Sequence, residues 1–210
     1  MNHLVLLGDS ILDNGAYTAG GPAVIAQLHA QLPADWNASL LAVDGSVTTD
    51  VISQLTRLPI DTTYLIISVG GNNAILQSDF VSEPAQSVSD VLQRMTVIAQ
   101  QFAHDYQAML TAVLKRGLPT TLCTVYDPNF TDPTVQQLMQ AGLVMFNDRI
   151  LRTAIHAHIP VIDLRMICTS PDDYANEIEP SVAGGAKIAD AIIRVMRHHD
   201  FTQRQTTIYT

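Results

Sequence analysis

The sequence predicts a single α/β domain built on a five-stranded parallel sheet with helices on both faces. Short apolar runs alternate along the chain with longer segments whose apolar residues recur at helical spacing. Strands that alternate with helices form parallel sheets, because each helix carries the chain back to the end of the sheet where the next strand begins. The length of 210 residues is enough for one such domain with a substantial core.

The expected strands are apolar runs that end at turn-forming or polar residues. The first run stops at Gly8 and the third at Gly70, as is typical where buried parallel strands end. The five predicted strands cover residues 4–7, 39–43, 64–69, 120–125 and 160–164.

Helices are expected between these strands. Pro22 suits the first turn of the first helix, and Ser87 with Asp90 resembles a capping box at the start of the third. The third helix would be roughly 45 Å long, so we expect it to bend or break. The predicted helices cover residues 23–32, 51–55, 87–116, 134–156 and 183–197.

The domain is expected to span residues 1–200, because no repeat, linker or low-complexity tract divides the chain. The remaining residues, 201–210, are polar and are predicted to form a frayed tail.

Composition excludes several classes of function. The chain has 11 Lys and Arg against 20 Asp and Glu, a net charge of −9, which argues against nucleic acids and anionic membranes as partners. Two cysteines, Cys123 and Cys168, cannot form a disulfide scaffold or a four-cysteine zinc site. No apolar run approaches the roughly 18 residues of a membrane span. The first strand begins almost at once, without the features of a signal peptide, so we expect a cytoplasmic protein.

Four segments should meet at one edge of the sheet, because ligands of parallel sheets bind beyond the carboxyl ends of the strands. Gly8-Asp9-Ser10 follows the first strand and Asp44-Gly45 the second. Residues 70–73 follow the third strand, and the loop before the last helix is the fourth segment.

Ser10 is a candidate nucleophile in this arrangement. The backbone N–H groups of Ser10 and Gly45, together with the side-chain amide of Asn72, would form an oxyanion hole. The alternative is that Ser10 caps a turn, that Gly45 is a turn glycine and that Asn72 occupies an ordinary turn.

These segments resemble the SGNH (GDSL-type) esterase and lipase family. The resemblance rests on residues 7–10, 44–45 and 68–72, and on residues 178–189 near the last helix. It implies a flavodoxin-like three-layer sandwich and hydrolysis of carboxylic esters through an acyl-enzyme, with Ser10 as nucleophile and the oxyanion hole just described. It also implies that neither a metal nor an organic cofactor is needed.

The chain departs from the family pattern in two places. The last block of the family usually reads Asp-x-x-His, and here Asn176 and Glu179 stand at the two positions. The third block usually ends in Asp, and here Asn73 replaces it. We therefore expect Glu179 to act as general base, with a pKa raised by partial burial, and Asn176 to hydrogen-bond its carboxylate.

The remaining polar residues are weaker candidates. Asp9, Asn73, Tyr126 and Asp127 are expected to line the pocket, although a capped turn is an alternative role for the last two. The seven histidines lie away from the expected edge, and no spacing of His, Cys and Asp suggests a metal site.

The sequence thus predicts a serine esterase acting on small or medium acyl esters, a small-molecule substrate. The alternative is a domain that has lost catalysis and serves as a ligand-binding or interaction module. The oligomeric state is not predicted.

Overall fold

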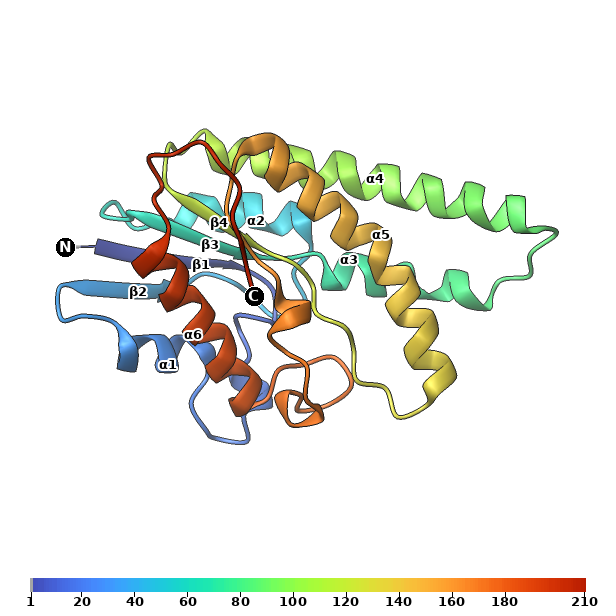
Figure 1. The fold of residues 1–210 in the computed structure, drawn as a ribbon, viewed down its shortest axis with the longest axis horizontal. Helices are drawn as coiled ribbons and strands as arrows, with labels where there is room; N and C mark the ends of the chain where they lie inside the picture. Colours follow the sequence, from blue (N-terminus) through green and yellow to red (C-terminus); the bar gives the residue numbers. More distant parts are fainter. Residues whose placement is uncertain (1) are drawn as a thin grey trace.

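The computed structural model describes residues 2–210 and shows three layers, with helices covering both faces of a parallel sheet (Figure 1). The sheet has six strands in the order β2-β1-β3-β4-β5-β6, and every neighbouring pair is parallel. The α/β prediction is confirmed, but the expected count of five strands was one too low. The strands are β1 (Asn2–Gly8), β2 (Trp36–Leu40), β3 (Tyr64–Ser68), β4 (Thr120–Cys123), β5 (Val161–Ile162) and β6 (Ile208–Tyr209).

The additional strand, β6, comes from the tail that was expected to fray. The N–H of Val161 donates to the carbonyl oxygen of Thr207 at 2.9 Å, and the N–H of Asp163 donates to the carbonyl oxygen of Tyr209 at 2.8 Å. Without the tail, these two donors of β5 would lie on an open sheet edge, and pairing with β6 covers them. Only two residues form the strand, too few to produce an alternating apolar pattern.

The helices divide between the two faces of the sheet. Figure 1 shows α1 and α6 together on one face and α2, α4 and α5 on the other. The α-helices are α1 (Val24–Gln31), α2 (Thr48–Gln54), α3 (Gly71–Ile75), α4 (Val88–Leu114), α5 (Pro133–Ala157) and α6 (Val182–His198). Short 3₁₀ helices are η1 (Gly15–Tyr17), η2 (Leu55–Arg57), η3 (Ser78–Ser82), η4 (Leu164–Met166) and η5 (Pro171–Asp173).

The long helix α4 runs without the break that was expected. Its 27 residues begin at a cap in which the Ser87 hydroxyl accepts the N–H of Asp90 at 3.1 Å. The half of α4 nearer its carboxyl end packs on the sheet through Phe102, Tyr106 and Met109. The other half extends, with α5, past the carboxyl ends of the strands (Figure 1). One end of α4 therefore belongs to the core, and the other end lines a cleft beyond the sheet.

The core lies on both sides of β1, whose residues Leu4, Val5, Leu6 and Leu7 are completely buried. Continuous burial on both faces is the reason that the strand has an unbroken apolar run. No helix among residues 2–210 combines the length and apolar character needed to cross a membrane.

Candidate active site

The turn after β1 holds Ser10 in a tightly constrained backbone. Gly8 has φ +128°, and a Cβ atom there would lie 1.7 Å from the carbonyl oxygen of Ser68. The side chain of Gln54 accepts the N–H of Gly8 and donates to its carbonyl oxygen, both at 2.8 Å. Only glycine fits at this position, and the paired hydrogen bonds from α2 determine the direction in which the chain leaves the strand.

The expected oxyanion donors come from three different loops. Within residues 2–210, the N–H groups of Ser10 and Gly45 have no hydrogen-bond acceptor, and Gly45 has φ +80°. The side-chain amide of Asn72 donates one N–H to the carbonyl oxygen of Ser46 at 3.0 Å, so its second N–H is free. This bond ties Asn72 to the loop that contains Gly45, and Asn72 and Ser10 line the same cleft.

Asn73, unlike Asn72, does not line the cleft. Its Oδ1 accepts the N–H of Thr48 at 3.1 Å, and its Nδ2 donates to the Thr48 hydroxyl at 3.3 Å. Asn73 therefore joins α3 to the start of α2, outside the lining of the cleft.

Glu179 lines the cleft together with Ser10 and is only 7% exposed. Burial raises the pKa of Glu179, the interaction with the Ser10 hydroxyl lowers it, and the negative charge of Asp44 raises it further. The atom Oε2 is buried and has no hydrogen-bond partner among the described residues. No hydrogen bond joins Ser10 to Glu179 among residues 2–210, but both residues line the cleft.

The loop before α6 is held by contacts to the Glu179 backbone. The Oδ1 atom of Asn176 accepts the N–H groups of Ile178 and Glu179, both at 2.9 Å. The carbonyl oxygen of Glu179 accepts the N–H of Ala175 at 2.8 Å. Asn176 thus shapes the backbone of the loop, whereas the sequence analysis expected it to contact the carboxylate.

Tyr126 and Asp127 also support this loop. The Tyr126 hydroxyl donates to the carbonyl oxygen of Ile178 at 2.7 Å, and the buried ring lines the cleft. Asp127 does not line the cleft. Its carbonyl oxygen accepts a hydrogen bond from the Tyr174 hydroxyl at 2.6 Å, and its carboxylate accepts one from the side-chain amide of Gln140 at 3.3 Å.

Asp9 is buried directly before Ser10 in the chain, with an exposed fraction of 1%. One carboxylate oxygen, Oδ1, accepts the N–H of Ile11 at 3.2 Å. Burial, followed by the charge of Glu179, raises the pKa of Asp9 to about 7, against the opposing effect of the N–H groups of Ile11 and Gly70.

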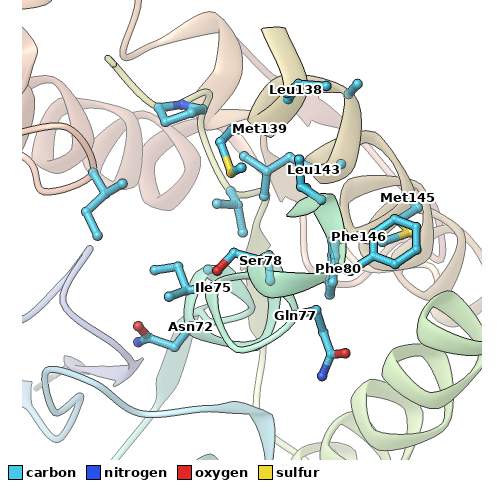
Figure 2. A pocket seen from close by; sticks show the side chains of 18 of the residues that line it. Asn72, Ile75, Gln77, Ser78, Phe80, Leu138, Met139, Leu143, Met145 and Phe146 are labelled. Atoms are coloured by element: carbon cyan, nitrogen blue, oxygen red, sulfur yellow. The ribbon is translucent and has the colours of Figure 1, made fainter. Parts of the chain in front are cut away.

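An apolar cleft of about 680 Å³ opens from Ser10 between α3, η3, α4 and α5. Figure 2 shows Ile75 and Phe80 across from Met139, Leu143 and Phe146 of α5. A cleft of this size with apolar walls and a few polar groups at one end is typical of a binding site for a small organic molecule.

A comparison with known protein families agrees with the fold and with the position of these residues. The profile of the GDSL-like Lipase/Acylhydrolase family matches residues 6–187, which include Ser10, Gly45, Asn72 and Glu179. The chain belongs to this family. No match was found among curated proteins.

Solved structures share the fold of this GDSL-like family member at low sequence identity. LAE5, an α/β hydrolase from the metagenome of Lake Arreo, Spain, is 20% identical, with a TM-score of 0.67 over 93% of this chain and 95% of its own. A lipase/acylhydrolase from Enterococcus faecalis is 18% identical, with a TM-score of 0.65 over 94% and 96%. An extracellular lipase from Streptomyces rimosus is 16% identical, with a TM-score of 0.64 over 94% and 99%.

None of the seven histidines of this GDSL-like protein lines the cleft. His3, for example, lies at the start of β1, where it contacts Asp61 at 2.9 Å and Ser39 at 2.8 Å. The start of a strand is at the opposite end of the sheet from Ser10, so His3 cannot contact Ser10.

Sequence reasoning missed two residues that position the site of this family member. Gln54 clamps Gly8, as described above. Asn14 is completely buried, accepts the N–H of Val24 at 2.9 Å and donates to the carbonyl oxygen of Pro180 at 3.2 Å, which joins the first loop to the one carrying Glu179. Their partners lie 46 and 166 residues away in the chain, so no local pattern marks them.

Proposed function

We propose that the protein is a serine esterase that hydrolyses small or medium acyl esters through an acyl-enzyme, with Ser10 as nucleophile and Glu179 as general base. The observation that carries this proposal is that Ser10 and the buried carboxyl group of Glu179 line the same cleft, where the Ser10 hydroxyl lowers the pKa of Glu179 and the Oε2 atom has no partner among residues 2–210. Membership of the GDSL-like lipase/acylhydrolase family supports the reaction class.

In the proposed reaction, ionised Glu179 accepts the proton of Ser10 as the serine oxygen attacks the ester carbonyl carbon. The N–H groups of Ser10 and Gly45 and the free N–H of Asn72 stabilise the oxyanion of the tetrahedral intermediate. Glu179 then returns the proton to the leaving alkoxide, and water hydrolyses the acyl-enzyme by the same steps. The raised pKa of Glu179 makes its carboxylate a stronger base than an exposed one.

The cleft supports an acyl group as the bound half of the substrate. Apart from a few polar residues, its walls are aliphatic, aromatic and methionine side chains, which favour a hydrocarbon chain over a sugar or a charged group. Methionine side chains are flexible, so the wall formed by Met95, Met139 and Met145 suits chains of more than one length.

A p-nitrophenyl ester series tests this proposal. Ser10→Ala and Glu179→Gln should each lower kcat by at least about 10²-fold, the usual scale for removing a nucleophile or base. Glu177→Gln is the matched control, because this exposed glutamate is in the same loop and does not line the cleft. Full activity of Ser10→Ala would overturn the assignment of the nucleophile. Full activity of Glu179→Gln would overturn the assignment of the base.

The second candidate is a ligand-binding module on the same fold, favoured by the presence of Glu at the position where the family usually has His. In that case the cleft would bind an acyl ester without turnover. A fluorophosphonate probe distinguishes the two, because it labels an activated serine: labelling that is lost in Ser10→Ala supports the esterase, and no labelling of the wild type supports the binding module.

A further inference from the structure

Two buried carboxyl groups flank the proposed nucleophile. Asp9 is 1% exposed and Glu179 is 7% exposed, and both line the same cleft as Ser10. Each carries one oxygen, Oδ2 of Asp9 and Oε2 of Glu179, that is buried without a hydrogen-bond partner among residues 2–210. Orphaned oxygens on two neighbouring buried acids require an explanation, because a buried carboxylate is unstable without hydrogen bonds or a counter-charge.

No positive charge compensates these two acids. None of the ion pairs formed within residues 2–210 includes Asp9 or Glu179. The Asp9 carboxyl accepts a hydrogen bond from the N–H of Ile11 at 3.2 Å, and the N–H groups of Gly70 and of Asp9 itself also lower its pKa. Beside it, Oδ2 lies 3.9 Å from the position that a Cβ atom on Gly71 would take, next to the segment that carries Asn72.

The other titratable groups around Asp9 are themselves acids. They are Tyr106 in α4, Cys123 in β4 and Tyr126 in the loop after β4. Burial raises the pKa of each, and the negative charge of Asp9 raises it further, so all three groups are neutral in the physiological range. Glu179 is therefore the neighbour whose negative charge adds to the effect of burial in raising the pKa of Asp9.

The two acids lose their protons in a definite order. The coupling between the two charges is reciprocal, so the order follows from their surroundings: Asp9 is 1% exposed and Glu179 7%, and the Ser10 hydroxyl lowers the pKa of Glu179. Glu179 thus ionises first, next to Ser10, while Asp9 still holds its proton. Two carboxylates at one buried site cannot both ionise easily, so the pair keeps a single negative charge over an intermediate range of pH.

We infer that Asp9 acts as a protonated carboxylic acid, a positioning residue whose neutral form leaves Glu179 as the only negative charge beside Ser10. This inference rests on the proposed function, since it assigns Asp9 a part in the same reaction. When Asp9 ionises, a second anion lies close to the place where the oxyanion develops, and the transition state is destabilised. The esterase therefore has an alkaline limit set by Asp9 and an acid limit set by Glu179.

The pH dependence of kcat/KM for a p-nitrophenyl ester tests this role. The wild type should show a bell, falling by roughly tenfold per pH unit above about pH 7 as Asp9 ionises. Asp9→Asn imitates the neutral acid and should lose the alkaline limb while keeping the acid limb, when each profile is normalised to its own maximum. Asp35→Asn is the control, because it removes an equal charge from the exposed turn before β2, at the other end of the sheet. An alkaline limb that persists in Asp9→Asn would overturn the inference.

Carbon-13 NMR of labelled aspartate side chains in Ser10→Ala gives a second test that does not depend on catalysis. The resonance that disappears in Ser10→Ala/Asp9→Asn identifies Asp9, and its titration should have a midpoint near 7. A midpoint below about 5, close to that of ordinary aspartates, would overturn the inference. Loss of the proposed function has a different signature, full activity in Ser10→Ala or Glu179→Gln, so the two failures are separable.

Discussion

The hydroxyl group of Tyr126, in the loop after β4, donates a 2.7 Å hydrogen bond to the carbonyl oxygen of Ile178, the residue before Glu179. This bond joins two edges of the cleft that are 52 residues apart in the chain. The same loop is held by Asn176 from within and by Asn14 from the turn after β1. The proposed base is therefore carried by an irregular segment that has little freedom to move relative to Ser10.

Removal of the Tyr126 hydroxyl should loosen this segment. Tyr126→Phe leaves the Ile178 carbonyl oxygen without its donor, and we expect a loss of stability of about 1–2 kcal/mol. If Glu179 is the base, kcat should fall more than KM rises. Urea unfolding and ester kinetics measure both effects, with Tyr209→Phe at the distant β6 strand as control. Unchanged kcat in a folded Tyr126→Phe protein would show that the loop does not need this bond.

Asn72 and Asn73 are adjacent but should respond differently to removal. Asn72→Ala deletes a proposed oxyanion donor and should lower kcat by about 10²–10³-fold with little change in KM. Asn73→Ala deletes the two bonds to Thr48 and should mainly reduce stability, by about 1–2 kcal/mol. Kinetics and thermal unfolding of both variants check the distinction. Equal kcat in wild type and Asn72→Ala would remove Asn72 from the oxyanion hole.

The buried acid Asp9 should make the protein less stable as pH rises. Its pKa is about 7 in the folded protein and near 4 in the unfolded chain, so between these values the folded state binds one more proton. Stability is therefore highest below about pH 4 for this group alone and falls until about pH 7, by on the order of 4 kcal/mol at most.

Asp9→Asn should remove this dependence. Its stability relative to the wild type should be greater at pH 8 than at pH 4, because the wild type has the cost of a buried charge only at the higher pH. Chemical denaturation of both proteins at the two pH values measures the difference. A difference that is the same at both pH values would mean that Asp9 is ionised throughout.

Gly8 and Gly142 form a matched pair for substitution by alanine. In Gly8→Ala the new Cβ atom would lie 1.7 Å from the Ser68 carbonyl oxygen at a positive φ, so β1 and β3 would have to separate; we expect failure to fold or a loss above about 4 kcal/mol. Gly142 lies within α5 with open space around it, and alanine there should increase stability by roughly 0.5–1 kcal/mol. Expression level and Tm of the two variants compare them directly, and a stable Gly8→Ala protein would contradict the close approach of the strands.

Much of the site could be predicted because it follows strand ends. Leu4 to Leu7 reads as a buried strand, and the polar residues after it must lie at the carboxyl edge of a parallel sheet, together with Asn72 after β3. The same logic failed for the last strand. Ile208 and Tyr209 pair with β5 only because the tail returns to that edge after α6, and two residues have no period to recognise.

The sequence by itself determined the parallel α/β fold, the place of Ser10 and Asn72 at one edge of the sheet, and the presence of Glu179 where a histidine is usual. Only the tertiary structure decided that Gln54 clamps Gly8, that Asn176 holds backbone rather than carboxylate, and that Asp9 is buried beside Glu179. The physical reason is the distance along the chain over which each effect acts. Apolar periodicity and turn chemistry act over a few residues, whereas burial and the pKa of a carboxyl group depend on every element packed around it.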